Sequence, residues 1–170
     1  MARIAFVLAD DFEDSEFQVP YERVRESGHH AVVVGKEKGV EVTGKRGRVK
    51  QGIDATPELV SVNDLDALVV PGGYSPDKLR TDSRIVSLVK HMDAAGKTVA
   101  FICHAGSLLI EADAVRGRRV TSWPSIKTDL VNAGAEWVDE PVVEDGNFIS
   151  SRKPDDLEPF SAALLARFTG

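Results

Sequence analysis

Residues 98–107 read TVAFICHAGS, in which five apolar or β-branched residues lead into the chain's single cysteine, a histidine and a turn of small residues. The run 98–102 shows no alternation of polar and apolar residues, which is typical of a strand buried on both faces of a parallel sheet. Apolar residues at helical spacing follow the turn. Cys103 is therefore predicted to stand at a sharp turn between a buried strand and a helix.

Three other short runs have the same character, at residues 4–8, 31–34 and 67–70. Helical spacing of apolar residues predicts helices around 17–24, 85–92, 108–112, 126–131 and 157–168. Pro20 lies within the first of these and predicts a kink or a late helix start. Strands that alternate with helices form βαβ units, so we expect a single α/β domain over residues 1–170, with a doubly wound parallel sheet covered by helices on both sides.

Two hairpins are expected to decorate this sheet. One covers residues 40–49 around two glycines, and the other pairs 142–143 with 148–149 across Asp145-Gly146.

Composition narrows the range of partners and compartments. A formal charge of -6 and a pI near 5.2 argue against nucleic acid or an anionic membrane as the main partner. No run approaches the roughly 18 apolar residues that span a bilayer, and no signal peptide is recognisable. One cysteine forms no internal disulfide, which suits a reducing compartment, so a cytoplasmic location is expected.

Three chemically distinctive loops follow three of the predicted strands. They are residues 9–14 (ADDFED), 71–74 (PGGY) and 103–107 (CHAGS). In doubly wound folds ligands gather beyond the carboxyl ends of the strands, so these loops are expected to converge at one edge of the sheet. The acids of the first loop lack a spaced partner elsewhere, and we expect no metal site.

Cys103 is the candidate nucleophile of this edge. A cysteine at the start of a helix gains a lowered pKa from the unpaired N–H groups there. The alternative is a buried structural cysteine.

His104 is the candidate general base or acid, or else a capping histidine. Glu13 is the candidate carboxyl partner of the sulfur, or else a helix N-terminal charge. Gly72 and Gly73 are expected to form an oxyanion hole with the amide of His104, or else a tight turn.

Four motifs together resemble the ThiJ/PfpI family, and most closely its PfpI-type intracellular protease branch. They are 9–14 (ADDFED), 70–73 (VPGG), 102–104 (ICH) and 121–124 (TSWP). The resemblance extends over nearly the whole chain. It implies a flavodoxin-like sandwich related to class I glutamine amidotransferases, with Cys103 as the elbow nucleophile and no cofactor.

The resemblance also implies a site shared between subunits. In the PfpI branch an acid of the neighbouring subunit orients the histidine beside the cysteine, so a homodimer or higher homo-oligomer is expected. The matching position is Asp77, where the family often has glutamate, and its shorter side chain weakens the expected triad. The family's Cys-His-Gly-Pro reads Cys-His-Ala-Gly here, and Tyr74 is expected to crowd the cleft. These departures weaken the case for peptidase activity.

Three functions remain open from the sequence. The first is a cysteine peptidase or amidase. The second is a cofactor-free enzyme that acts on reactive dicarbonyls such as methylglyoxal, or on their protein adducts, through a hemithioacetal on Cys103. The third is a non-enzymatic redox sensor or chaperone, with Cys103 oxidised to a sulfinate held by Glu13. We rank stress protection by dicarbonyl or oxidant chemistry above proteolysis.

Overall fold

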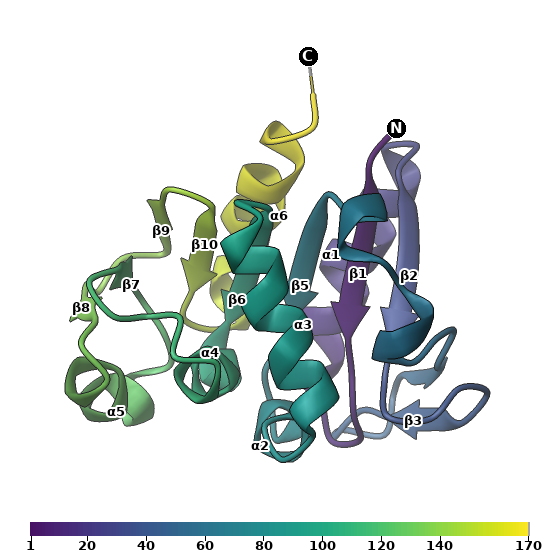
Figure 1. Ribbon diagram of the computed structural model, residues 1–170, viewed down its shortest axis with the longest axis horizontal. Helices are drawn as coiled ribbons and strands as arrows, with labels where there is room; N and C mark the ends of the chain where they lie inside the picture. The colour runs from purple at the N-terminus through teal and green to yellow at the C-terminus, as the bar shows by residue number, and fades with distance from the viewer. Residues whose placement is uncertain (170) are drawn as a thin grey trace.

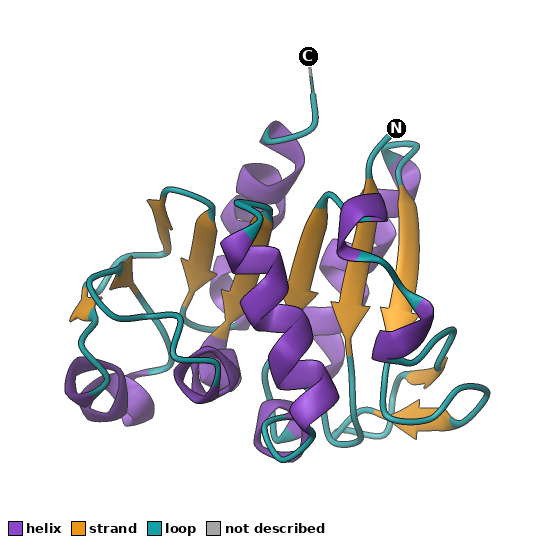
Figure 2. Ribbon diagram, viewed as in Figure 1, coloured by secondary structure: helices purple, strands orange, loops and turns teal. Residues whose placement is uncertain are grey.

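The computed structural model describes residues 1–169, and its centre is a six-stranded sheet in the order β2-β1-β5-β6-β10-β9 (Figure 1). Its strands are β1 (Arg3–Val7), β2 (His30–Val34), β5 (Ala67–Val70), β6 (Thr98–Ile102), β9 (Val142–Asp145) and β10 (Phe148–Ser151). All neighbouring pairs are parallel except β9 and β10. The arrowheads of the parallel strands therefore point to one edge, where the loops of interest gather (Figure 2).

Helices cover both faces of this sheet. One face carries α1 (Asp14–Glu26) and α6 (Leu157–Ala166). The other carries α2 (Ser75–Leu79), α3 (Ser83–Ala94), α4 (Gly106–Glu111) and α5 (Lys127–Asn132). Short 3-10 turns occupy Pro57–Leu59, Val62–Asp64, Cys103–Ala105, Pro124–Ile126 and Pro154–Asp156. The predicted doubly wound sandwich is confirmed.

The alternation of strand side chains divides the core into two layers. Along β1, Ala5 and Val7 face the α3 side, whereas Ile4 and Phe6 face α1 and α6. All four are fully buried. Because both faces of each central strand are buried, the strands need apolar residues at every position, which explains their continuous apolar runs.

The prediction that both hairpins decorate the sheet is wrong for the second one. Its strand β10 enters the main sheet and pairs in parallel with β6, while β9 forms the sheet edge. Phe148 and Ser150 are fully buried there. The first hairpin does stand apart, as the antiparallel pair β3 (Glu41–Thr43) and β4 (Lys50–Gly52).

A further small sheet was not anticipated. It pairs β7 (Arg119–Val120) in parallel with β8 (Glu136–Trp137). Two-residue strands of mixed polarity carry no recognisable period, so sequence patterning does not find them.

Of the two alternatives expected at Pro20, a kink or a late helix start, the late start is wrong. Helix α1 begins at Asp14 and continues through Pro20 to Glu26. Pro20 lacks the N–H of a regular helical residue, but it is buried within α1, and the helix continues through it despite the missing bond. The early start places Glu16 in the first turn of the helix. Among residues 1–169, no helix has the length and apolarity needed to cross a bilayer.

Candidate functional site

Cys103 occupies a strained elbow at the carboxyl end of β6. Its φ is 64°, in the left-handed region that side-chain-bearing residues rarely adopt. The amide of Trp123 donates to the Cys103 carbonyl at 3.1 Å and holds the turn from outside. The residue is buried, with 8% of its surface exposed.

His104 lies between the sulfur and a serine. Its Nδ1 is 3.4 Å from Sγ of Cys103, and its Nε2 is 3.2 Å from Oγ of Ser125. Burial, together with the positive charge of Lys45, lowers the pKa of His104, so the ring is neutral at neutral pH. A neutral ring carries one N–H. With that proton on Nε2 it donates to Ser125, and Nδ1 is left free to accept the proton of the thiol.

The carboxyl group that lies against Cys103 belongs to Glu16. Glu16 is fully buried, and its Oε1 accepts the amide of Gly72 at 3.0 Å. A Cβ added to Gly72 would lie 2.5 Å from Glu16 Oε1 and 2.8 Å from Cys103 Cβ. The glutamate and the cysteine are thus separated only by the missing side chain of Gly72. Oε2 of Glu16 is buried without a hydrogen-bond partner among residues 1–169.

The environment of Glu16 keeps it protonated. Burial and the nearby charge of Glu13 raise its pKa to about 8, against an ordinary value of 4.5, although the Gly72 amide, Lys45 and the Cys103 thiol oppose this. At neutral pH the side chain is therefore a neutral acid that can donate a hydrogen bond through Oε2.

The predicted lowering of the Cys103 pKa is not what the structure shows. Burial and the charge of Glu16 raise the pKa of Cys103 to about 12, and the amides of His104 and Gly73, with the charge of Lys45, oppose that rise. Burial of the sulfur at the elbow outweighs the N–H groups that face it. The contribution of Glu16 disappears while that residue is protonated, but the resting group remains a thiol that needs a base.

Glu13 and Asp77, the other predicted acids, are placed differently. Glu13 forms ion pairs with Lys45 at 2.9 Å and Arg46 at 2.7 Å. Burial raises the Glu13 pKa, but hydrogen bonds from Arg46 and Lys45 outweigh it and lower the pKa overall. Asp77 is exposed on α2 and faces the same cleft as His104, with no hydrogen bond to that ring among the described residues.

The glycine pair has two separate contacts. The amide of Gly73 faces the sulfur, as the amide of His104 does, whereas the amide of Gly72 is used by Glu16. Gly73 has a φ of 78°, and a Cβ there would lie 2.4 Å from the Glu13 amide nitrogen. Gly73 therefore requires glycine for packing against the loop at 11–13, whereas Gly72 requires it for the close approach of Glu16 and Cys103.

The cleft beside His104 is small and mixed in character, with a volume of about 260 Å³. It is lined by Gly73, Tyr74, Asp77, Arg80, His104, Ser107, Ile110, Ile126 and Asp129. Tyr74 is 63% exposed and forms part of the lining of the cleft. Within residues 1–169, no cluster of three or more His, Cys, Asp or Glu side chains is arranged to hold a metal ion.

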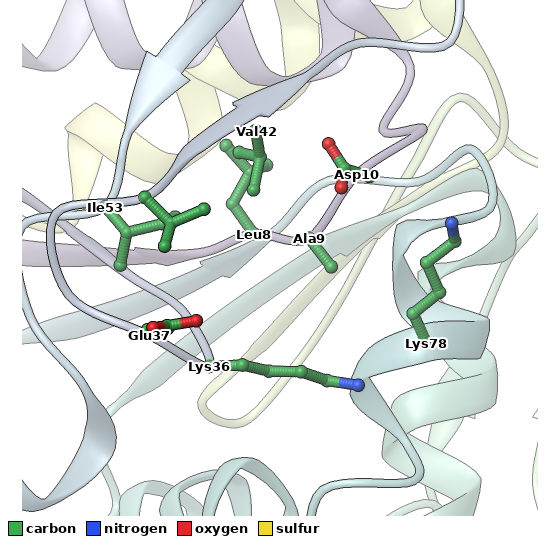
Figure 3. Close-up of a pocket in the computed structure, with 9 residues that line it drawn as sticks. Leu8, Ala9, Asp10, Lys36, Glu37, Val42, Ile53 and Lys78 are labelled. Atoms are coloured by element: carbon green, nitrogen blue, oxygen red, sulfur yellow. The ribbon is translucent and has the colours of Figure 1, made fainter.

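A second pocket of about 230 Å³ lies beside the end of β1 (Figure 3). Leu8, Val42 and Ile53 form its apolar side, and the side chains of Lys36 and Lys78 approach its rim. Neither Cys103 nor His104 lines it. The pocket is therefore separate from the cysteine site, and its lining carries two acidic and two basic side chains, Asp10, Glu37, Lys36 and Lys78.

A family model matches residues 2–167 of the chain, that of the DJ-1/PfpI family. The chain belongs to the DJ-1/PfpI family. The resemblance drawn from the four motifs is thereby confirmed, as is the flavodoxin-like fold that it implied.

Relatives within this family support the assignment over almost the full length. The chain is 44% identical over 155 residues to the protein named Deglycase PfpI of Pyrococcus furiosus, covering 91% of this chain and 92% of the relative. It is 45% identical over 165 residues to General stress protein 18 of Bacillus subtilis, covering 96% of each.

A solved structure from Anabaena variabilis, a two-domain protein with DJ-1/ThiJ/PfpI-like and ferritin-like domains, superposes with a TM-score of 0.97 at 38% identity. The match covers 98% of this chain, which spans 48% of that longer protein.

Two residues of the site were missed from the sequence, Glu16 and Ser125. Glu16 precedes Phe17 and shares its side of the helix with Pro20 and Val24, all of which are buried. A carboxylate on a buried helix face is the anomaly that would have pointed to it. Ser125 follows Trp123-Pro124 in a 3-10 turn, and no pattern in the sequence places it beside His104.

Replacing Glu16 or Glu13 by glutamine distinguishes the effects of the two glutamates on the pKa of Cys103. At pH 9 to 10, where Glu16 is ionised, Glu16→Gln removes the charge that raises the pKa of Cys103. Alkylation of Cys103 by iodoacetamide is then expected to become faster, with its pH profile displaced to lower pH. Glu13→Gln, the matched control, is expected to displace the profile less. A larger displacement of the pH profile by Glu13→Gln than by Glu16→Gln would contradict the placement of Glu16 beside the sulfur.

The raised pKa of Glu16 also makes folding stability depend on pH. Between pH 4.5 and about 8, the folded chain holds the Glu16 proton while the unfolded chain has lost it, so rising pH favours unfolding. Relative to Glu16→Gln, the wild type should lose on the order of 4 kcal/mol of unfolding free energy across this window, since each tenfold change in proton binding is worth about 1.4 kcal/mol. Urea unfolding of both proteins at pH 5 and pH 8 measures this. An equal pH dependence in the two would show that Glu16 titrates normally.

Proposed function

We propose that this chain is a cofactor-free, Cys103-dependent enzyme that removes reactive dicarbonyls such as methylglyoxal, or the adducts they form on proteins, under stress. The observation that carries the proposal is the position of the Cys103 sulfur, 3.4 Å from Nδ1 of a neutral His104. The small cleft that His104 lines suits a substrate of a few carbon atoms. Relatives named as a deglycase and a general stress protein support the same class of chemistry.

In the first step the thiol adds to the aldehyde carbon. Nδ1 of His104 takes the S–H proton as the bond between sulfur and carbon forms. The aldehyde oxygen, held by the amides of Gly73 and His104, receives a proton from the imidazolium and becomes a hydroxyl. The product is a hemithioacetal on Cys103, and the histidine is neutral again.

In the second step the neutral His104 removes a proton from the former aldehyde carbon and returns it to the neighbouring carbonyl carbon through an enediol. No electrons leave the substrate, because one carbon is oxidised as its neighbour is reduced. The hemithioacetal thereby becomes the thioester of a 2-hydroxy acid. Water cleaves this thioester, which releases the hydroxy acid and restores the thiol. We assign Glu16, protonated and with Oε2 free, as the acid that donates a hydrogen bond to the substrate oxygen during this exchange.

Ser125 is proposed to position His104 for these steps. By accepting the Nε2–H it fixes the tautomer in which Nδ1 faces the sulfur. A hydroxyl stabilises an imidazolium less than a carboxylate does, and amide hydrolysis depends on a strongly basic histidine. This contact therefore favours addition to an aldehyde over peptide hydrolysis, which we keep as the alternative.

A redox role for Cys103 is a second candidate. The observation that favours it is the free Oε2 of the protonated Glu16, which can donate a hydrogen bond to an oxygen of a sulfinate. Mass spectrometry of the purified protein treated with peroxide distinguishes the two. Stoichiometric sulfinate without dicarbonyl turnover would favour sensing.

We further propose that the chain acts as a homodimer with Asp77 near the neighbouring site. The exposed Asp77 and Tyr74 on the rim of the His104 cleft support this. Light scattering is expected to give a dimer mass. Mixing Cys103→Ala chains with Asp77→Asn chains is expected to restore part of the activity that each has lost. A monomer with full activity would exclude a shared site.

The enzymatic proposal predicts loss of methylglyoxal consumption and of 2-hydroxy acid formation in Cys103→Ala. Ser125→Ala is expected to lower kcat/KM about five- to tenfold, the value of one hydrogen bond of about 1–1.5 kcal/mol, and to displace the pH profile of the rate. Ser125→Thr keeps the hydroxyl and should retain most of the activity.

Ser107→Ala is the matched control, since Ser107 lines the same cleft without a hydrogen bond to His104 in the described chain. Methylglyoxal turnover that survives Cys103→Ala would overturn the proposal. Hydrolysis of peptides by a protein that leaves methylglyoxal untouched would favour the peptidase instead.

A further inference from the structure

One cationic side chain at the cysteine site takes no part in the mechanism above. Lys45 lies in the loop between β3 and β4, and its Nζ is 2.9 Å from Oε2 of Glu13. The same ammonium lies 5.7 Å from the centroid of the Tyr74 ring, at the rim of the His104 cleft. The Lys45 side chain is 31% exposed, so it remains accessible to a solute.

The loop that carries Lys45 is fixed in place by the start of α1. The carboxylate of Asp14 accepts the amides of Arg46 at 2.9 Å, Arg48 at 3.0 Å and Val49 at 2.9 Å. Gly44 packs so closely that a Cβ would lie 2.3 Å from Asp14 Oδ2. These contacts hold the loop backbone in one conformation, and the ion pair with Glu13 positions the Lys45 ammonium.

A short chain of contacts joins Lys45 to the nucleophile. The Lys45 amide donates to the Phe12 carbonyl at 2.8 Å, and Phe12 pairs with Gly73, whose amide faces the sulfur. In keeping with this proximity, the charge of Lys45 lowers the pKa of both Cys103 and His104.

The charges around Lys45 are balanced rather than acidic, although the chain as a whole has a formal charge of -6. Glu13 is shared between Lys45 and Arg46, so two cations face one carboxylate. Asp14 is a second carboxylate beside the loop, where it accepts backbone amides, and Glu16 is neutral below a pH of about 8. The partly exposed Lys45 ammonium beside Tyr74 is therefore a cation available to an anionic group on this side of the cleft.

We propose that Lys45 binds the carboxylate of a substrate whose reactive carbonyl is attacked by Cys103. The preferred substrates would then be short oxo acids and aldehydes that carry a carboxylate next to the carbonyl, ahead of neutral dicarbonyls of equal size. The assignment rests on the proposed function for its nucleophile. It adds a specificity-determining residue on a loop that the reaction itself does not need.

Two alkylating reagents of equal size test the assignment without any turnover. Iodoacetate carries a carboxylate and iodoacetamide a neutral amide, and both react with the same thiolate of Cys103. The ratio of their second-order rates cancels the fraction of thiolate and reports the attraction for the anion. In the wild type this ratio, normalised to that of glutathione, is expected to exceed one. In Lys45→Met it should fall about three- to tenfold, and the difference should shrink at high salt.

Two further variants complete the experiment. Lys45→Arg keeps the charge and should keep most of the wild-type ratio, which covers the case in which Lys45→Met folds poorly. Lys36→Met removes a lysine from the separate pocket beside β1 and should leave the ratio unchanged. An equal ratio in wild type and Lys45→Met would overturn the proposal. Because the ratio is read from alkylation, this outcome is independent of whether the protein turns over methylglyoxal.

Discussion

The site depends on the absence of a side chain at Gly72. Three segments distant in sequence meet there: the first turn of α1, the loop after β5 and the elbow after β6. Any Cβ would collide with Glu16 Oε1 and with Cys103 Cβ at distances below 3 Å. Because the glycine amide also binds Glu16, the backbone serves both as spacer and as hydrogen-bond donor. Close packing, rather than a chain of ion pairs, brings the acid to the sulfur.

This packing defines the protonation states from which the chemistry starts. A buried acid beside a buried thiol makes it costly for both to be ionised, so the pair holds its protons at neutral pH. The neutral His104 then becomes the group that can accept a proton, and its Nδ1 is the nitrogen turned to the sulfur. A thiol with a base beside it gains its nucleophilicity during the reaction and stays less reactive at rest.

The sequence was most informative where local pattern and burial coincide. Continuous apolar runs located four of the six strands of the main sheet, β1, β2, β5 and β6, and the position of Cys103 after one of them located the site. Burial that depends on the tertiary fold was harder to foresee. Ser150 and Ser151 suggest a loop, yet both are fully buried in β10 because that strand enters the sheet beside β6.

The same difficulty applies to the site residues. Glu13 was chosen from the acidic loop at 9–14, whereas Glu16 lies two residues beyond that loop, in the first turn of helix α1. The lowered pKa expected for Cys103 followed from the local helix start, and desolvation by distant segments reversed it. Only the fold brings these segments together.

The separateness of the β3–β4 hairpin has a consequence for how such a molecule diversifies. The hairpin forms its own two-stranded sheet, and its loop is attached to the body through a few contacts at the start of α1. The nucleophile, the histidine and the buried acid all lie on other segments. Changes in the loop can alter what approaches the sulfur while the reacting groups stay in place. Substitutions in this one loop can therefore change the range of accepted substrates without disturbing the conformation of the Cys103 elbow.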